Sequence, residues 1–209
     1  MMDVKHRIDT LMSRQYRRPT GLLGRVVGER MVRQHGPETQ WTLSLLGITA
    51  TDWILEIGCG AGQAIALAAT LAPDGHVTGL DLSSAMVRAA SRRNARAIKE
   101  GRVSVRLGDV AHLPFADRQF DRVLSVHTLY FWPDPARAVA EIGRVLALGG
   151  RLALTLSPGT VDADEDVGVR AVVDQQVIPA MERARFSTVS IERGPDSRRY
   201  KTVAVVGMK

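Results

Sequence analysis

The sequence predicts an α/β fold: a doubly wound, mostly parallel sheet that ends in an antiparallel C-terminal hairpin and carries helices on both faces. Short apolar runs alternate with helical patterns between residues 53 and 156, and a glycine-rich turn follows the first run directly. Residues 186–208 then alternate or run apolar around a Gly-Pro-Asp turn. Alternation of strands and helices favours parallel strands with right-handed crossovers, and the closing pattern is typical of a β-hairpin.

The parallel strands are expected to be short and apolar, over residues 53–57, 76–81, 103–107, 121–126 and 151–156. Helices are expected between them over 62–71, about 84–100 and about 135–146. Ser83 or Ser84 is the expected N-cap of the second helix, and Pro135 suits the first turn of the third. A glycine pair at 149–150 is expected to close that third helix. A helix over 169–181 and strands over 186–192 and 200–208 complete the expected chain.

The N-terminal part is expected to be a helical cap or arm. Residues 1–20 are polar and rich in arginine, and apolar residues then recur at helical spacing over 22–32. The Gly-Pro pair at 36–37 is expected to break that helix. A second helix over 38–46 is expected to bury Trp41 and Leu45 and to stop at Gly47.

Composition limits the class of protein. The chain of 209 residues is 45% hydrophobic and 24% charged, which suits one compact domain. The net charge is +6, and the first 40 residues hold eight Lys or Arg against four Asp or Glu. Such clusters can attract nucleic acid, but no lysine-rich tail or stacking aromatics accompany them, which favours a solvated face. No apolar run is long enough to cross a bilayer, and no signal-peptide core is present, so a cytoplasmic location is the expectation.

A glycine turn at residues 58–62 is the strongest functional signal. Gly58, Gly60 and Gly62 follow a predicted strand and precede a predicted helix, so the backbone can bend tightly and approach a ligand. A dinucleotide fingerprint needs its third glycine at position 63, which is Gln63 here. The turn resembles the first motif of the class I methyltransferases that use S-adenosylmethionine, which have a Rossmann-like sheet. That resemblance covers about residues 45–157 and is closest to small-molecule enzymes such as those of quinone biosynthesis.

Two acidic residues at strand ends extend the resemblance. Asp81 closes the second predicted strand beside the glycine turn, where a carboxylate can accept both ribose hydroxyls, or simply cap the next helix. Asp109 follows the third strand, and the resemblance implies that it meets the adenine amine while the Val110 amide meets a ring nitrogen. A plain turn at residues 108–109 is the alternative.

Other residues complete the expected cofactor site. Glu56 is a carboxylate in an apolar strand, where burial is costly unless it is paired, and it suits the ammonium of the cofactor or a structural hydrogen bond. Cys59, the single cysteine, fits a small buried residue better than a catalytic thiol. The cofactor-binding residues that the resemblance implies are Glu56, Gly58, Cys59, Gly60, Gly62, Gln63, Asp81, Leu82, Met86, Asp109, Val110 and His127.

The acceptor side is expected after the fourth strand, over residues 125–135. Tyr130, Phe131 and Trp132 suggest an apolar wall for a small hydrophobic acceptor, or a simple cover for the end of the sheet. His127 is the candidate catalytic base for an oxygen acceptor, with His112 second; a packing role for His127 is the alternative. A carbon acceptor activated by its own neighbouring phenolate would not require a protein base. No metal site is expected, since the acidic run at 162–166 reads as a solvated loop.

The sequence thus predicts methyl transfer from S-adenosylmethionine to a small organic acceptor, on oxygen or carbon, with S-adenosylhomocysteine as product. A nucleic-acid or protein methyltransferase that uses the basic arm and a nicotinamide-dependent oxidoreductase are the alternatives. The expected organisation is a single domain, 1–209. Residues 1–50 form the cap or arm, 51–157 the cofactor-binding core, and 158–209 a helix with the hairpin. The sequence leaves the oligomeric state open.

Overall fold

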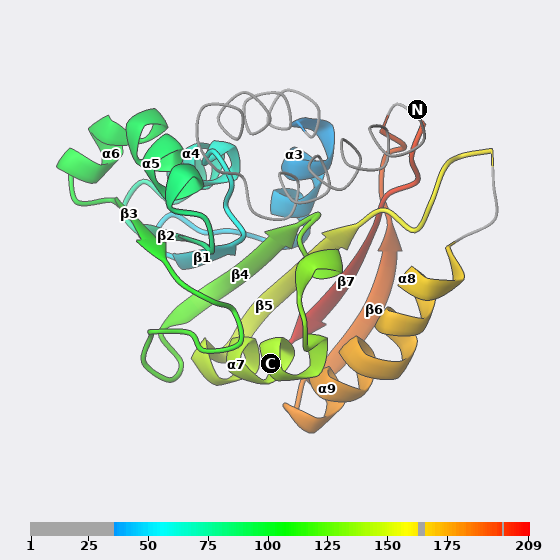
Figure 1. The fold of residues 1–209 in the computed structure, drawn as a ribbon. Helices are drawn as coiled ribbons and strands as arrows, with labels where there is room; N and C mark the ends of the chain where they lie inside the picture. Colours follow the sequence, from blue (N-terminus) through cyan, green and yellow to red (C-terminus); the bar gives the residue numbers. More distant parts are fainter. Residues whose placement is uncertain (1–35, 163–165, 198) are drawn as a thin grey trace.

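The protein is described by a computed structural model that places residues 36–162, 166–197 and 199–209 (Figure 1). The arm over 1–20 and the helix expected over 22–32 lie outside the described residues. In the described part, seven strands form one sheet in the order β3-β2-β1-β4-β5-β7-β6. The strands are β1 (Trp53–Ile57), β2 (His76–Asp81), β3 (Val103–Leu107), β4 (Phe120–Val126), β5 (Leu146–Leu156), β6 (Thr188–Arg193) and β7 (Val203–Met208).

The sheet is parallel from β3 to β5 and antiparallel at its C-terminal edge, as expected. β1 pairs in parallel with β2 and β4, which brings the ends of both neighbours beside the turn that follows β1. β7 inserts antiparallel between β5 and β6. The strand order reverses at β1 and β4, and in doubly wound sheets ligands bind at such a switch point, outside the carboxyl ends of the strands.

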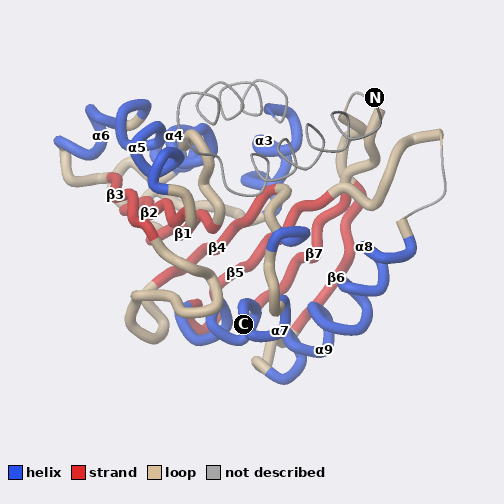
Figure 2. The backbone as a smooth tube through the Cα atoms, viewed as in Figure 1, coloured by secondary structure: helices blue, strands red, loops and turns tan. Residues whose placement is uncertain are grey.

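Helices cover both faces of the sheet (Figures 1 and 2). Their bounds are α3 (Gly36–Leu45), α4 (Gln63–Leu71), α5 (Ser84–Arg93), α6 (Ala95–Lys99), α7 (Pro135–Val145), α8 (Val167–Val172) and α9 (Ile178–Arg183), with a 3-10 turn η1 (Leu129–Phe131) and a π-helical stretch η2 (Val173–Val177) between α8 and α9. One buried apolar cluster contains side chains of α3, α4 and α5, and a second contains side chains of α7, η2 and α9. The two clusters are the two layers that the amphipathic pattern requires.

Several local expectations were wrong. The helix expected over 84–100 breaks at Asn94, whose side-chain amide turns inward to donate to the carbonyls of Gly62 (3.0 Å) and Ala90 (2.9 Å). The glycine pair at 149–150 does not close a helix, because α7 ends at Val145 and the pair lies within β5.

The buried face of α3 is the main surprise. Trp41 and Leu45 are only partly buried, whereas Glu38, Thr39 and Thr42 are buried with Leu43. The reason is that α3 packs on β4 and β5, where polar groups face it. The hydroxyl groups of Thr42 and Thr155 of β5 lie 2.6 Å apart. Helix α3 therefore contributes Leu43 to the apolar cluster and also buries polar side chains against the sheet.

Candidate functional site

The glycine turn is fixed to the neighbouring strand by its backbone. The amides of Gly58 and Cys59 both donate to the carbonyl of Leu80 in β2, at 2.8 and 3.0 Å. Gly58, Gly60 and Gly62 all have positive φ angles, between 51° and 80°. Glycine adopts this region without steric cost, so the turn forms without strain.

The three glycines have different surroundings. A Cβ at Gly58 would lie 2.3 Å from the Thr128 side chain, and one at Gly62 would lie 2.7 Å from the Asn94 amide and 2.8 Å from Ala90. Among the described residues, no atom lies within 4 Å of a Cβ placed at Gly60. Gly58 and Gly62 are therefore small because neighbouring side chains need the room. In the part of the chain that the structure describes, the space beside Gly60 is unfilled, which lets a ligand approach its backbone.

Asp81 meets the glycine turn as the sequence predicts. Its Oδ2 accepts from the amide of Gly60 at 2.9 Å, and its Oδ1 accepts from the amide of Ser83 at 2.8 Å. Each oxygen keeps a second lone pair for a ligand hydroxyl. Burial raises the pKa of this carboxyl, and the two amides oppose that effect. The Ser83 hydroxyl accepts from the Met86 amide at 3.4 Å, so the capping role belongs to Ser83.

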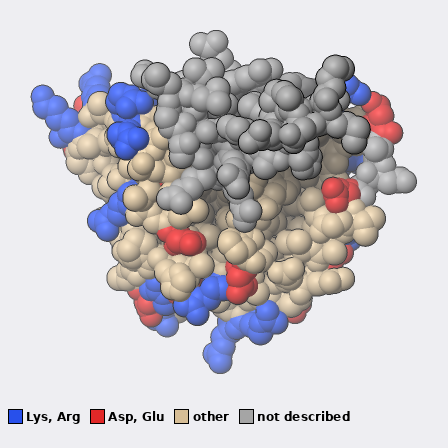
Figure 3. Space-filling view, in the orientation of Figure 1, with Lys and Arg blue, Asp and Glu red and all other residues tan. Residues whose placement is uncertain are grey.

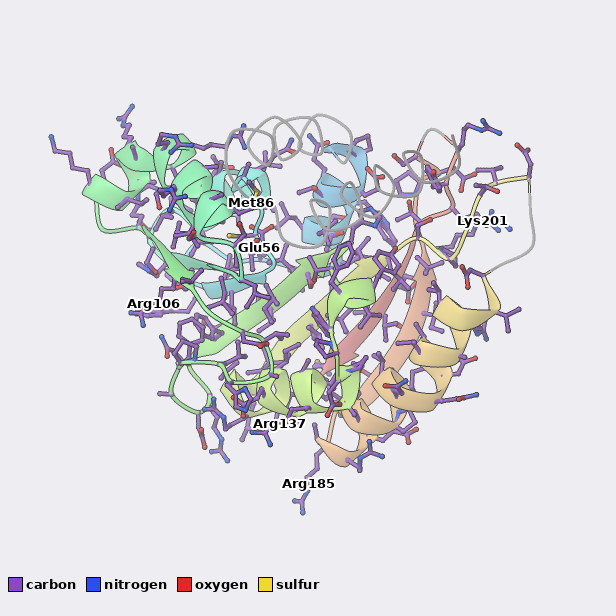
Figure 4. All side chains as sticks on the ribbon, in the orientation of Figure 1. Glu56, Met86, Arg106, Arg137, Arg185 and Lys201 are labelled. Carbon is purple, nitrogen blue, oxygen red and sulfur yellow. The ribbon has the colours of Figure 1, made fainter. Side chains whose placement is uncertain are left out.

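Glu56 is a buried carboxylate with a strongly perturbed pKa. It is 5% exposed, and its Oε2 has no hydrogen-bond partner among the described residues. Burial raises its pKa to about 8, the Ile65 backbone amide at the start of α4 lowers it, and the charge of Asp81 raises it further. A cation in the adjoining space would stabilise the ionised form. Figure 4 shows Glu56 and Met86 where β1, α4 and α5 meet.

The remaining residues that were predicted to bind the cofactor differ in their burial. Cys59 is buried, its pKa is raised by that burial, and a thiol of this kind is unreactive. Gln63 begins α4, Met86 is buried, and Leu82 is 48% exposed. The loop after β3 also lies beside Asp81, because the Gly108 amide donates to the Asp81 carbonyl at 3.0 Å.

The loop after β3 presents Asp109 at the surface. One oxygen of its carboxylate accepts from the Ala111 amide at 2.9 Å, and the side chain is exposed. Val110 is instead buried in the apolar cluster beneath the loop. Both the turn that we considered as an alternative and an accessible carboxylate are therefore present at this position.

The segment after β4 brings His127 beside the glycine turn. The next residue, Thr128, fills the space beside Gly58. The amide of His127 donates to the Thr155 carbonyl at 2.8 Å. His127 has a positive φ of 57°. Its Nε2 lies 3.7 Å from Oε1 of Glu38, a residue of α3 that no sequence pattern singled out.

The aromatic residues of this segment do not form one wall. Trp132 is buried in the apolar cluster of α7 and Phe131 is partly buried, whereas Tyr130 is 40% exposed. The Tyr130 hydroxyl donates to the Ser157 carbonyl at 3.2 Å and accepts from the Ser157 amide. Tyr130 is therefore the aromatic side chain that borders solvent here.

The described ranges, 36–162, 166–197 and 199–209, contain neither a cluster of metal-binding side chains nor a membrane-spanning helix. Those ranges hold no group of three or more His, Cys, Asp or Glu side chains arranged to hold a metal ion. Only the two ends of the acidic run at 162–166 are described. Across the same ranges, every helix is too short or too polar to traverse a bilayer.

Comparison with known proteins defines the class. The sequence profile of a methyltransferase domain matches residues 55–154, which contain the glycine turn, Asp81 and Asp109. The chain is 30% identical to the uncharacterized methyltransferase YdaC of Bacillus subtilis over 80% of this chain and 89% of that protein. The chain belongs to the methyltransferase family, and within it to the S-adenosylmethionine-dependent class I enzymes.

Two further comparisons bear on the acceptor and the fold. The chain is 37% identical to demethylmenaquinone methyltransferase of Lactiplantibacillus plantarum over 56% of this chain, and spans about half (51%) of that relative. The structure superposes with a TM-score of 0.69 on geranyl diphosphate C-methyltransferase from Streptomyces coelicolor, solved with S-adenosylhomocysteine, at 16% identity over 84% of this chain and 79% of that one. At this identity the second likeness is one of fold.

Proposed function

We propose that this chain transfers the methyl group of S-adenosylmethionine to a small, hydrophobic organic acceptor, on oxygen or carbon, by in-line displacement. The observation that carries the proposal is the contact between the Gly60 amide and the Asp81 carboxylate, next to open space at Gly60. This contact brings the backbone bend after β1 and the proposed ribose-binding carboxylate at the end of β2 together. The buried Oε2 of Glu56, which has no hydrogen-bond partner within the described ranges, supplies a site for the ammonium of the same ligand.

The expected binding residues divide by the part of the cofactor that they would hold. We propose Asp81 for the ribose hydroxyls, Glu56 and the glycine turn for the methionine portion, and Asp109 with the Val110 amide for adenine. Gln63, Leu82 and Met86 would line the site around them, and Cys59 and Gly58 would shape the turn. The bound sulfonium supplies an activated methyl group, so the chain must align the acceptor and exclude water, which can contribute up to about 7–11 kcal/mol.

The organisation of the chain supports a small acceptor. We propose one domain in which residues 51–157 hold the cofactor, while 1–50 and 158–209 shape the acceptor side. Helix α3 lies over the ends of β4 and β5, and exposed Tyr130 borders the same region. The name of one relative, demethylmenaquinone methyltransferase, indicates that its acceptor is a small organic molecule.

The binding test compares two aspartates. Asp81→Ala should weaken S-adenosylhomocysteine binding about 100-fold by calorimetry, because two charge-assisted hydrogen bonds to the ribose are lost. The matched control is Asp74→Ala, an exposed aspartate in the turn between α4 and β2, which should leave the Kd unchanged. A folded Asp81→Ala protein with normal affinity would remove Asp81 from the site.

A second candidate, methyl transfer to a nucleic acid, is favoured by one observation. The segment 84–107 holds seven Lys or Arg and one acid, and these side chains gather over α5 and α6 (Figure 3). Incubation with methyl-labelled S-adenosylmethionine, hydroquinone, RNA and DNA separates the candidates. Label in hydroquinone supports the small acceptor. Label only in nucleic acid, with binding that falls steeply as salt rises, overturns it.

A further inference from the structure

The loop between β3 and β4 is tied to helix α7 by hydrogen bonds to its backbone. This loop covers residues 108–119, contains no helix or strand, and lies beside α7 (Figure 1). The contacting residues of α7 are Arg137, Glu141 and Arg144, whose spacing places them on one face of a helix. Backbone groups in a loop without regular structure need other partners, and this face of α7 supplies them.

Arg144 uses its whole guanidinium group in these contacts. Its Nη2 donates to the Leu113 carbonyl at 2.9 Å, and its Nη1 donates to the Phe115 carbonyl at 2.8 Å. Nη1 also donates to Asp117 at 2.8 Å, while Nε and Nη2 donate to the two carboxylate oxygens of Glu141 at 3.0 and 2.8 Å. Arginine presents five N–H donors in a rigid planar fork, and every one of them has a partner here. Lysine has a single nitrogen and cannot reproduce this arrangement.

Glu141 holds the Arg144 fork and the loop at the same time. Its Oε2 accepts from the Leu113 amide at 2.9 Å, so both polar backbone groups of Leu113 are bonded to α7. The hydrogen bond from Arg144 lowers the pKa of Glu141, which keeps the carboxylate ionised at neutral pH. Pairing through both carboxylate oxygens orients the other N–H groups of Arg144 toward the loop. We call Glu141 and Arg144 the α7 clamp.

The clamped residues directly follow the segment that we propose for adenine. The His112 amide donates to the Asp109 carbonyl at 3.1 Å, and the Ala111 amide donates to the Asp109 carboxylate at 2.9 Å. Nε of Arg137, from the same face of α7, donates to the Ala111 carbonyl at 3.2 Å. The turn that carries the Asp109 carboxylate is therefore itself attached to α7.

Apolar packing holds the same segment from the other side. Val110, Leu113 and Phe115 are buried in the apolar cluster that also contains Val139 and Ile142 of α7. Close-packed side chains leave little room for an independent shift of one of them. A displacement of the clamped residues therefore moves the proposed adenine contacts as well.

We propose that Arg144 is a positioning residue for the adenine end of the cofactor site. By holding the Leu113 and Phe115 carbonyls, it sets where the Asp109 carboxylate and the Val110 amide meet the base. This inference rests on the proposed function and deepens it, because it makes selection of the base depend on a residue of α7. All the donors of Arg144 go to protein groups, so it acts through the loop rather than on the methyl group.

Two ligands that differ in the base test the inference. S-inosylhomocysteine carries a carbonyl oxygen where S-adenosylhomocysteine carries the exocyclic amine, so it has no donor there for a carboxylate. In the wild-type protein, calorimetry should give a Kd for the inosyl compound that is about 30-fold higher or more. Arg144→Lys keeps the positive charge but loses the fork. The ratio of the two Kd values should therefore fall about fivefold or more.

Two control variants separate positioning from stability. Asp117→Asn changes an exposed partner of Arg144 and leaves both carbonyl contacts, so it should retain the ratio. Arg183→Lys changes an exposed arginine of α9 and should leave both Kd values unchanged. A purely structural loss weakens both ligands by the same factor, because the folded fraction scales both affinities alike. The ratio therefore reports positioning alone.

Hydrogen exchange in the wild-type protein provides a test that needs no variant. The Leu113 amide is bonded to Glu141, so its exchange reports opening of the α7 clamp. Saturating S-adenosylhomocysteine should slow this exchange about threefold or more, because a ligand and a clamp that fix the same segment stabilise each other.

The outcomes separate this inference from the proposed function. An unchanged ratio in folded Arg144→Lys overturns the inference, as does a wild-type protein that binds both ligands equally well. If Arg144→Lys does not fold, unchanged exchange of the Leu113 amide on ligand binding overturns it, and slowed exchange supports it. Failure of the wild-type protein to bind S-adenosylhomocysteine overturns the proposed function instead.

Discussion

The buried carboxyl of Glu56 makes the stability of the folded protein depend on pH. The unfolded chain ionises this carboxyl near its ordinary pKa of 4.5, whereas burial raises the folded pKa to about 8. Between these values the folded state binds more protons than the unfolded state, so its stability falls as pH rises. Below about pH 4.5 the penalty is absent, and above about pH 8 it is complete.

Glu56→Gln should therefore stabilise the protein without cofactor at pH 8. We expect a gain of about 3–5 kcal/mol in the free energy of unfolding, because each pKa unit corresponds to about 1.4 kcal/mol. The gain should shrink as pH falls toward 4.5. Urea unfolding at several pH values measures it, and exposed Glu192→Gln serves as control. The same Glu56→Gln variant should bind S-adenosylhomocysteine more weakly, because the charge opposite the ammonium is gone. A gain independent of pH would contradict the role of the buried charge.

Individual side chains differed in how well the sequence could predict them. Asp81 was predictable because a strand-end carboxylate and a strand-end turn must meet where neighbouring parallel strands end. Glu38 was not, because it lies 89 positions before His127 and the contact exists only after α3 has packed on the sheet. The same packing explains why Trp41 and Leu45 were wrongly expected to be buried: the inward face of α3 carries Leu43 together with polar side chains.

Among the elements, the glycine turn allows a test that separates packing from binding. Gly60→Ala and Gly62→Ala add the same methyl group at positive φ. At Gly60 the methyl enters open space, so we expect a stability loss of about 1 kcal/mol and much weaker S-adenosylhomocysteine binding. At Gly62 it strikes Asn94 and Ala90, so we expect about 2–4 kcal/mol of destabilisation.

Thermal unfolding measures the stability of both variants, and calorimetry measures their affinity for S-adenosylhomocysteine. At 25 °C, folded Gly62→Ala should retain more affinity than Gly60→Ala. The reverse order of affinities would show that the ligand approaches the turn at Gly62. Replacing Gly60 with Val should block binding, by filling the same space with a larger side chain.

The elements themselves were predicted where local signals agreed. The bounds of β1, β2 and β3 match the expected residues, because apolar runs there are punctuated by glycine, proline and charged turns. The break between α5 and α6 was missed, because it depends on Asn94 reaching the Gly62 carbonyl. The π-helical stretch between α8 and α9 carries no sequence signal that we recognise.

The molecule as a whole should respond to the cofactor, because the proposed site joins several elements. Gly60 belongs to the turn after β1, Asp81 to β2, and Gly108 to the segment after β3, and hydrogen bonds connect all three. A ligand that binds them only when folded stabilises the whole domain by mass action. At 100 times the Kd the gain is about 2.7 kcal/mol. For a chain of this length that corresponds to a rise in Tm of roughly 5–10 °C.

S-adenosylhomocysteine should produce this rise in a thermal scan, and NAD at the same concentration should not. The turn has Gln63 where a dinucleotide fingerprint needs glycine, and α4 begins at that residue. In that fingerprint the third glycine allows the helix to pack closely on the strand, and Gln63 has a side chain at this position. Asp81→Ala should abolish the rise with S-adenosylhomocysteine, which ties the global effect to the local contact. A rise with NAD and none with S-adenosylhomocysteine would instead make the chain a nicotinamide-dependent protein on a methyltransferase fold.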